Sequence, residues 1–467
     1  MFFASMFPLP LRPLWRFATS VSGGSHMDVE EGTLKASLLD ISVRTDELQD
    51  KGPSHKLHHI YDGDAKGYLT MVVISCLVTL LIGLACLFTA TPATQKATDL
   101  FPPPPLHHIY ASSHYDAGYQ HGLLAKERIH GWLRVAEMKN RFKWASQAGS
   151  AIFAQLKQDN AKEFPTYVKE MQGIAAGAGV TMDQIWVANL INEIDALISQ
   201  EGTGTFVLPW SMQHCSDEYG VSSKGYESGF AHGHNDDWSA EAGPYLYWLA
   251  ISPTPGAEEI VKRCAGLTYP GTLVGWAPSW NAHGMFFTQN TLMPMMTRPS
   301  GLGAVFTQKR AVCETAGIDE AIASVKKPGW SSGASLNLVD LSNKRMANVE
   351  VYMDTHSVFE ITPAIGNYSH FNEYKHLRTA SGARIDSPLV GKDDPRQGRS
   401  YMLPPVVNAE DIRMRLSDPL IYRKNKTLIT TILNGTTGML DVWCCGVTAT
   451  DSPPHYSWNL PSFFDAN

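Results

Sequence analysis

Residues 214–218 read HCSDE, and residues 233–238 read GHNDDW. The character of the chain changes around these two motifs. Upstream of them, apolar residues recur at helical spacing, whereas beyond Phe206 short apolar or β-branched runs are separated by Gly, Pro and Asn. A cysteine at such a junction is either a structural residue, as a buried thiol or half of a disulfide, or a nucleophile, whose thiol needs a partner that stabilises or removes its proton.

The periodicity predicts helices before this junction and mostly strands after it. Helices are expected at 116–144, 164–178, 182–198 and 303–323. Strands are expected at 245–251, 284–288, 335–340 and 348–353. Helices followed by strands, a further helix and more strands predict an α+β layered domain.

Length and charge narrow the functional classes. The chain has 467 residues, enough to bury a sizeable core. Its formal net charge is -7, and Lys and Arg are scattered singly. No basic stripe could follow a phosphate backbone, so nucleic-acid binding is disfavoured.

Residues 69–90 predict a membrane anchor. This stretch contains no charged residue, and a helix of that length, at ~1.5 Å per residue, would cross a hydrocarbon core of ~30 Å. A buried core helix is the alternative, but such helices are usually shorter and carry a polar face. Lys51, Lys56 and Lys66 precede the span and only Lys96 follows it closely, which predicts a single-pass signal anchor with a cytoplasmic N-terminus.

The anchor divides the chain into four parts. Residues 1–68 are expected to be a disordered cytoplasmic tail, 69–90 the transmembrane signal anchor, 91–105 a Pro-rich linker and 106–467 a lumenal or extracellular domain. Three Asn-x-Ser/Thr sequons lie beyond the span and are candidate glycosylation sites: Asn367, Asn425 and Asn434.

The number of cysteines in the domain is odd, so one thiol has no disulfide partner there. Two cysteines lie inside the predicted span, and the domain has five: Cys215, Cys264, Cys313, Cys444 and Cys445. Adjacent Cys444 and Cys445 are not expected to pair easily with each other. Bonds from them to Cys264 or Cys313 are possible, and the sequence does not determine the pairing.

Residues 106–440 resemble a known family in a series of motifs that occur in the family's order. The motifs are YDAGYQHG at 115–122, YVKEMQGIAAGAGV at 167–180, MDQIWVANLINEID at 182–195, HCSDE at 214–218, GHNDDW at 233–238, WNAHGMFFTQNTL at 280–292 and SHFNEY at 369–374. Together they resemble the isopenicillin N acyltransferase and β-alanyl-amine hydrolase (Tan-like) family of N-terminal-nucleophile cysteine hydrolases. The resemblance implies a four-layer αββα sandwich for the domain.

The resemblance also implies a self-activating nucleophile. Family members cut their own backbone before the Cys, which here places the cut between His214 and Cys215. The freed α-amine, with an ordinary pKa of about 7.7 to 8.0, then serves as base for the thiol. His214 stands where the family often has Gly, whose flexibility would ease strain at the cut, so the rate of cleavage stays open.

Asp237 and Asn372 match the family's supporting residues. Asp237 corresponds to an acid that orients or polarises the nucleophile, and Asp236 is the less favoured of the pair. Asn372 corresponds to an amide that helps hold the oxyanion or the nucleophile. Lower-ranked support is expected from Asn290, Asn235 and Ser216. Arg423, Lys424 and Lys426 compete for one basic position near a late strand.

Neither a metal nor a cofactor is predicted. The spacing of His232 and His234 is not that of a helical zinc motif, and no Glu or Cys adjoins them to complete a set. No Gly-x-Ser-x-Gly elbow, Walker motif or Rossmann motif occurs.

The predicted function is an amidohydrolase that cleaves small N-acyl amines through a Cys215 thioester. The resemblance extends its substrates to β-alanyl conjugates of biogenic amines. Two alternatives stay open: an acyltransferase with the same nucleophile, and an inactive ectodomain that serves as a binding module. The two chains produced by the cut are expected to stay associated. Nothing in the sequence addresses the particular membrane or the oligomeric state.

Overall fold

The computed structural model describes residues 100–201, 215–257, 262–276, 278–292, 294, 296–382, 385 and 394–465. The predicted tail, the anchor at 69–90, most of the linker and His214 lie outside these residues. Among the helices that are described, none combines the length and apolarity that a bilayer crossing needs. The anchor and the topology drawn from it therefore stay predictions.

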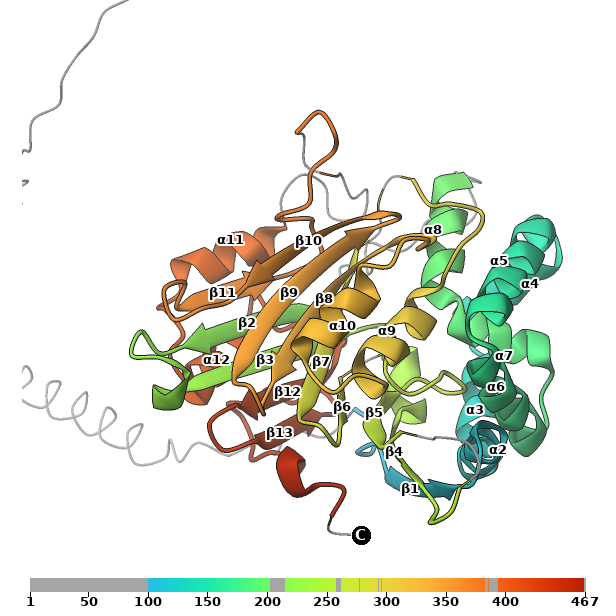
Figure 1. Ribbon diagram of the computed structural model, residues 1–467, viewed down its shortest axis with the longest axis horizontal. Coiled ribbons are helices and arrows are strands. Elements are labelled where there is room, and N and C mark those ends of the chain that lie inside the picture. Colours follow the sequence, from blue (N-terminus) through green and yellow to red (C-terminus); the bar gives the residue numbers. More distant parts are fainter. Residues whose placement is uncertain are drawn as a thin grey trace, which may run out of the picture. The chain divides into compact units, whose positions relative to one another are not determined.

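Two β-sheets face each other at the centre of the domain (Figure 1). The larger sheet has the order β1-β4-β5-β6-β7-β8-β9-β10, and the smaller has the order β11-β2-β3-β12-β13-β14. The strands of the larger sheet are β1 (Leu106–Ala111), β4 (Tyr247–Pro253), β5 (Cys264–Thr268), β6 (Ser279–Asn281), β7 (Met285–Leu292), β8 (Gly333–Asp340), β9 (Arg345–Tyr352) and β10 (Thr355–Glu360). Those of the smaller sheet are β2 (Ser216–Val221), β3 (Phe230–Asp237), β11 (Asn367–His370), β12 (Thr427–Asn434), β13 (Met439–Cys444) and β14 (Tyr456–Asn459).

Helices cover the outer face of each sheet. Helices α9 (Ala304–Cys313) and α10 (Ile318–Val325) pack on strands of the larger sheet, and α11 (Pro395–Met402) and α12 (Ala409–Leu416) pack on strands of the smaller one (Figure 1). Gly233 of β3 makes room for α12, since a Cβ there would lie 2.2 Å from the Ile412 side chain. The layers therefore run helix, sheet, sheet, helix. The predicted α+β class is confirmed, and the layer order agrees with the predicted sandwich.

Among the described residues, a block of seven helices precedes the nucleophile strand. Its members are α2 (His114–Leu124), α3 (Lys126–Leu133), α4 (Ala136–Ser146), α5 (Ser150–Glu163), α6 (Pro165–Ala178), α7 (Met182–Asn189) and α8 (Ile191–Glu201). Glycines from the first two family motifs bring α2 and α6 together. A Cβ on Gly118 would lie 1.8 Å from the Glu170 carbonyl oxygen, and one on Gly177 would lie 2.2 Å from that of Tyr119. The backbones can approach this closely only because these residues have no side chain.

Several predicted helices are shorter than expected. The single helix expected at 116–144 is three helices, and those expected at 182–198 and 303–323 are two helices each. In the last case Gly317 adopts an extended conformation before α10, and Asp319 and Glu320 follow in the first turn, where carboxylates favour a helix start. The four predicted strands are confirmed as β4, β7, β8 and β9, with boundaries that differ by a few residues.

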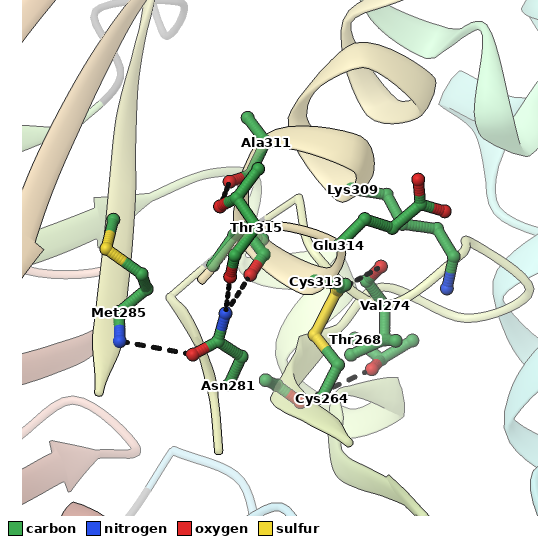
Figure 2. The surroundings of a disulfide bond; sticks show 12 residues. Cys264, Thr268, Val274, Asn281, Met285, Lys309, Ala311, Cys313, Glu314 and Thr315 are labelled. Carbon is green, nitrogen blue, oxygen red and sulfur yellow. Dashed lines mark hydrogen bonds between the residues drawn. A yellow bond between two sulfur atoms is a disulfide. The ribbon is translucent and has the colours of Figure 1, made fainter. Parts of the chain in front are cut away.

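Two disulfides form among the domain cysteines. Cys264 of β5 pairs with Cys313 at the end of α9, which ties the larger sheet to its covering helix (Figure 2). Cys444 pairs with its neighbour Cys445. The expectation that adjacent cysteines would not pair is therefore wrong: Cys445 takes a left-handed conformation, with φ of 70°, at the turn that ends β13. Cys215 is the free cysteine, as the odd count requires.

Candidate active site

The register of β2 and β3 decides which side chains meet Cys215. Asp217 lies opposite His234, and this antiparallel register continues to place Cys215 opposite Asp236. Side chains alternate between the faces of a strand. Asp236 is therefore on the face of the Cys215 thiol, whereas Asp237 is on the other face.

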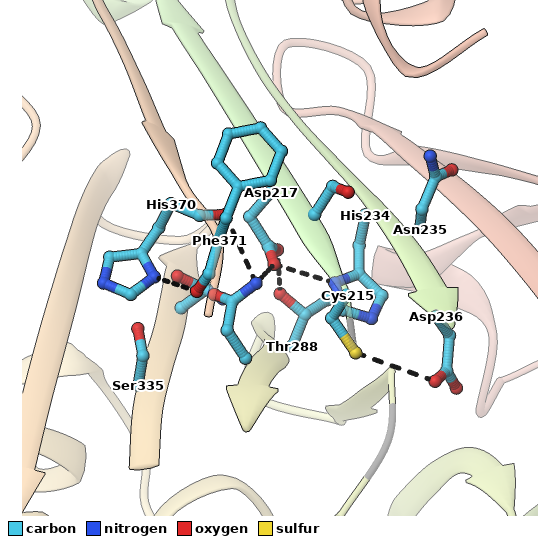
Figure 3. A network of polar contacts seen from close by, with 12 residues as sticks. Cys215, Asp217, His234, Asn235, Asp236, Thr288, Ser335, His370 and Phe371 are labelled. Carbon is cyan, nitrogen blue, oxygen red and sulfur yellow. Dashed lines mark hydrogen bonds and ion pairs between the residues drawn. The ribbon is translucent and has the colours of Figure 1, made fainter. Parts of the chain in front are cut away.

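The thiol is buried against a carboxylate. Cys215 is 4% exposed, and its Sγ donates to Oδ1 of Asp236 at 3.9 Å (Figure 3). The hydroxyl of Tyr269 donates to the same oxygen at 3.1 Å. Burial, together with the negative charges of Asp236 and Asp237, raises the pKa of the thiol well above its ordinary value. The backbone of Cys215 has φ of 39°, which is uncommon for a residue with a side chain.

Burial also shifts the two carboxylates. It raises the pKa of Asp236 to about 6, although His234 and the Tyr269 hydroxyl oppose the shift. It raises the pKa of Asp237 too, against the opposing effects of Arg396 and Thr427. Both groups are poised closer to neutral pH than ordinary aspartates, which is a feature of catalytic carboxylates.

Arg396 joins the three predicted catalytic residues on the other face. Its Nη1 donates to the backbone oxygen of Cys215 at 3.3 Å and to Oδ2 of Asp237 at 3.4 Å. Its Nη2 donates to Oδ1 of Asn372 at 2.6 Å. Asp394, the N-cap of α11, holds the same guanidinium at 2.7 Å. The structure thus brings Cys215, Asp237 and Asn372 together through one buried cation.

Sequence reasoning missed Arg396. The signal was the run Asp394-Pro395-Arg396, since an N-cap Asp followed by Pro predicts a helix start and places the arginine in its first turn. Among the three basic residues that compete for the late-strand position, Arg423 is close enough to Asp237 and Cys215 for their charges to raise its pKa, against the larger lowering by burial. Lys424 is exposed. Burial lowers the pKa of Lys426 and the charge of Asp237 raises it, but Cys215 is not among the groups that shift it.

The lower-ranked residues have different positions. Ser216 receives a hydrogen bond from Arg396 at 3.5 Å. Asn290 of β7 donates to Asp217 at 2.7 Å and so links the two sheets. Asn235 bonds to the Leu416 carbonyl at 3.0 Å, away from the thiol. Its position supports packing of α12 on the sheet.

Asp217 is the centre of a buried polar network between the sheets (Figure 3). It accepts from Thr288 and Asn290 of β7 and bonds to His232 and His234, the latter through Nδ1 at 2.9 Å. Burial alone would raise the pKa of Asp217, but the two histidines lower it well below its ordinary value. The same contact raises the pKa of His234 against the effect of burial.

His234 was considered in the sequence only as a metal ligand, yet it belongs to the thiol's surroundings. One ring nitrogen of His234, Sγ of Cys215 and a carboxylate oxygen of Asp236 lie within 4.8 Å of one another. These donor types could hold a metal ion. The thiol donates to Asp236, however, and Asp217 holds the imidazole, which is an arrangement suited to proton transfer. The prediction that no metal binds stays a prediction.

A small pocket opens at the thiol. Its lining is Cys215, His234, Asp236, Trp238, Tyr269, Trp276, Gln289 and Thr291. The three aromatic rings contact one another, with centroids 4.9 to 6.0 Å apart. The pocket therefore combines aromatic faces with one carboxylate.

Known proteins resemble the chain in these regions. Residues 225–388 match the model of the acyl-coenzyme A:6-aminopenicillanic acid acyl-transferase family. The predicted family resemblance is confirmed. The matched region includes Asp237 and Asn372 and begins after Cys215. A curated relative, the beta-alanyl-dopamine/carcinine hydrolase of Drosophila melanogaster, is 22% identical over 359 residues, which are 71% of this chain and 88% of that protein.

Two solved structures have a partial likeness to the chain. Penicillin V acylase from Agrobacterium tumefaciens is 11% identical, with a TM-score of 0.31, over 50% of this chain and 84% of that one. A conjugated bile acid hydrolase mutant from Clostridium perfringens is 10% identical, with a TM-score of 0.29, over 49% and 89%. Overlap this low adds no weight to the assignment. The predicted enzyme class, an N-terminal-nucleophile hydrolase or acyltransferase, is confirmed.

Proposed function

We propose that the chain cuts itself before Cys215 and then hydrolyses small N-acyl amines through a thioester on that residue. The observation that carries the proposal is the contact set of Arg396, which joins Cys215, Asp237 and Asn372. A free, buried thiol that lines an aromatic pocket supports it as well.

The α-amine freed by the cut takes the proton of the Cys215 thiol. The sulfur bonds to the substrate's acyl carbon. The α-amine passes the proton to the substrate's amine, which then leaves. Water then attacks the thioester, which yields a carboxylic acid and restores the thiol. Arg396 holds the nucleophile's carbonyl, so that Cys215 keeps its position when the residue before it departs.

One amide N–H of Asn372 donates to the Thr291 carbonyl at 2.9 Å, and its oxygen is held by Arg396. These two contacts fix the orientation of the amide. The geometry supports a role for Asn372 in positioning the nucleophile, with any contribution to the oxyanion left to its second N–H.

β-Alanyl amines are the substrates that we propose. The Drosophila relative is named for β-alanyl-dopamine and carcinine. In this chain, the faces of Trp238, Tyr269 and Trp276 and the carboxylate of Asp236 line the pocket. Such a lining suits an ammonium group, because cations are attracted both to aromatic faces and to carboxylates.

An acyltransferase remains the second candidate, since the matching family model bears that name. The chemistry would differ only in the acceptor, which would be an amine in place of water.

The anchor at 69–90, a lumenal or extracellular location, glycosylation and the continued association of the two chains complete the proposal. The inactive-ectodomain alternative predicts that no cut occurs.

Intact-mass analysis and N-terminal sequencing of the full chain, beside a Cys215→Ala variant, test this function. We expect a wild-type fragment that begins at Cys215 and is absent from the variant. The cut protein should then release amine from β-alanyl-dopamine or carcinine, and the variant should not. A single uncut chain in both samples would overturn the maturation step and favour the inactive ectodomain.

A further inference from the structure

The first step of maturation needs a base that the finished enzyme does not need. In the uncut chain, the nitrogen of Cys215 is part of a peptide bond and cannot accept the thiol proton. The thiol is also a poor nucleophile while it keeps that proton. Another group must therefore receive the proton before the first cut.

Asp236 is the carboxylate in position to do so. Its Oδ1 accepts from the Cys215 thiol at 3.9 Å and from Tyr269 at 3.1 Å. Its Oδ2 is buried and has no hydrogen-bond partner among the described residues. Asp237 points away from the thiol and is already bonded to Arg396 and Thr427. The strand register therefore separates the two neighbouring carboxylates into different tasks.

His234 lies beside the same thiol, and its orientation is fixed. Asp217 bonds to its Nδ1 at 2.9 Å, while a ring nitrogen lies within 4.8 Å of the thiol and of Asp236. Thr288 and Asn290 from the facing sheet hold Asp217 in turn. A protonated imidazole held in this way provides a positive charge where the thiolate forms.

We propose that Asp236 accepts the thiol proton of Cys215 when the uncut chain cleaves itself, with His234, held by Asp217, as the cation beside the thiolate. This inference rests on the proposed function, because it concerns the maturation of the same site. It assigns a catalytic task to the carboxylate that the sequence ranked below Asp237.

The atoms balance as follows. The proton moves from Sγ to Asp236, and the sulfur bonds to the carbonyl carbon of residue 214. The bond from that carbon to the Cys215 nitrogen breaks, and Asp236 returns the proton to the nitrogen. Water hydrolyses the resulting thioester to a carboxylic acid and restores the thiol. No oxidant or metal is required.

The test compares cleavage with thiol reactivity in Asp236→Asn. The full chain would be made by pulse-labelled cell-free synthesis with detergent micelles, and loss of the uncut form followed with time. We expect Asp236→Asn to cleave about 100-fold more slowly, the scale of general-base effects. Its Cys215 should nevertheless react faster with iodoacetamide at pH 7.5 while uncut, because loss of a nearby negative charge makes the thiol more acidic.

These opposite changes separate a base from a simple electrostatic neighbour. If Asp236 acted only through its charge, removal of that charge would speed both reactions. Cleavage of Asp236→Asn at or above the wild-type rate would therefore overturn the inference and leave the proposed function intact. A wild-type chain that never cleaves would overturn the proposed function itself.

Further variants distinguish loss of the base from misfolding. Asp319→Asn removes an exposed carboxylate elsewhere and should cleave at the wild-type rate. Asp236→Glu keeps a carboxylate and should retain at least about a tenth of that rate. If Asp236→Asn fails to fold, the cleavage rates of Asp236→Glu and His234→Gln test the inference in its place. Wild-type cleavage in His234→Gln would remove the cation from the inference.

Discussion

The guanidinium of Arg396 donates to the backbone carbonyl of Cys215 at 3.3 Å, although 181 positions separate the two residues in the chain. The start of helix α11 is thereby joined to the start of strand β2. Because the guanidinium also bonds to Asp394 and Asp237, its removal would take one buried cation away from two carboxylates.

Arg396→Met should destabilise the fold by about 3 to 5 kcal/mol, the cost typical of a buried charge that loses its partner. Urea unfolding followed by circular dichroism would measure it. Arg399→Met is the matched control from the same helix, because Arg399 is part-exposed and, among the residues that the structure describes, forms an ion pair with Asp418. Equal losses in the two variants would contradict the buried role of Arg396.

Glu193 predicts a pH dependence of stability. Burial raises its pKa to about 7, while its Oε1 accepts from the backbone of Ala304 at the start of α9. A raised carboxyl pKa stabilises the fold at low pH, and this contribution is lost as the pH rises from about 4.5 through 7. Glu193→Gln should therefore gain stability relative to wild type at pH 8, on the order of 3 kcal/mol, and little at pH 4.5.

Chemical denaturation across that pH range would check the effect. Glu127→Gln, an exposed change on α3, should keep the wild-type pH dependence. A constant difference between Glu193→Gln and wild type at every pH would show that ionisation of Glu193 is not its cause.

Gly118→Ala should lower stability by about 3 kcal/mol, at the upper end for overpacking, because the new Cβ would overlap the backbone of α6 at Glu170. Gly398→Ala is the control, since no atom lies within 4 Å of a Cβ at that helical glycine. There the change should leave stability equal or up to about 1 kcal/mol higher. Thermal melts of both variants would reveal whether the contact between α2 and α6 is as close as described.

Non-reducing peptide mapping should recover Cys264 joined to Cys313, Cys444 joined to Cys445, and Cys215 free after alkylation of the unfolded protein. Replacing Cys264 and Cys313 together by Ala should cost about 4 kcal/mol, as estimated for a loop of this length. Cys215 recovered in a disulfide would contradict its role as nucleophile.

Much of the site was accessible from the sequence because the family motifs carry it. Cys215, Asp237 and Asn372 lie in short conspicuous blocks, and the structure joins all three through Arg396. Short apolar runs also revealed strands of the larger sheet, such as β4. The fold class followed from the change of pattern near residue 206.

The rest depends on pairing partners, which local pattern does not determine. Only the register of β2 against β3 shows that Asp236, not Asp237, shares a face with the thiol. In the same way, His234 became part of the site through its cross-strand neighbour Asp217. Strand β12, whose partner β3 lies far away in the chain, escaped prediction, and so did β13 and β14, which continue the sheet from it.

Strand β1 comes from the part of the chain before residue 214, yet it pairs in parallel with β4, which comes after. A cut at Cys215 would thus divide one sheet between two polypeptides. The uncut chain should refold from denaturant at a rate independent of dilution. The cut protein should refold by a bimolecular reaction whose half-time lengthens as the protein is diluted. After maturation, refolding of the domain would therefore require association of two separate chains.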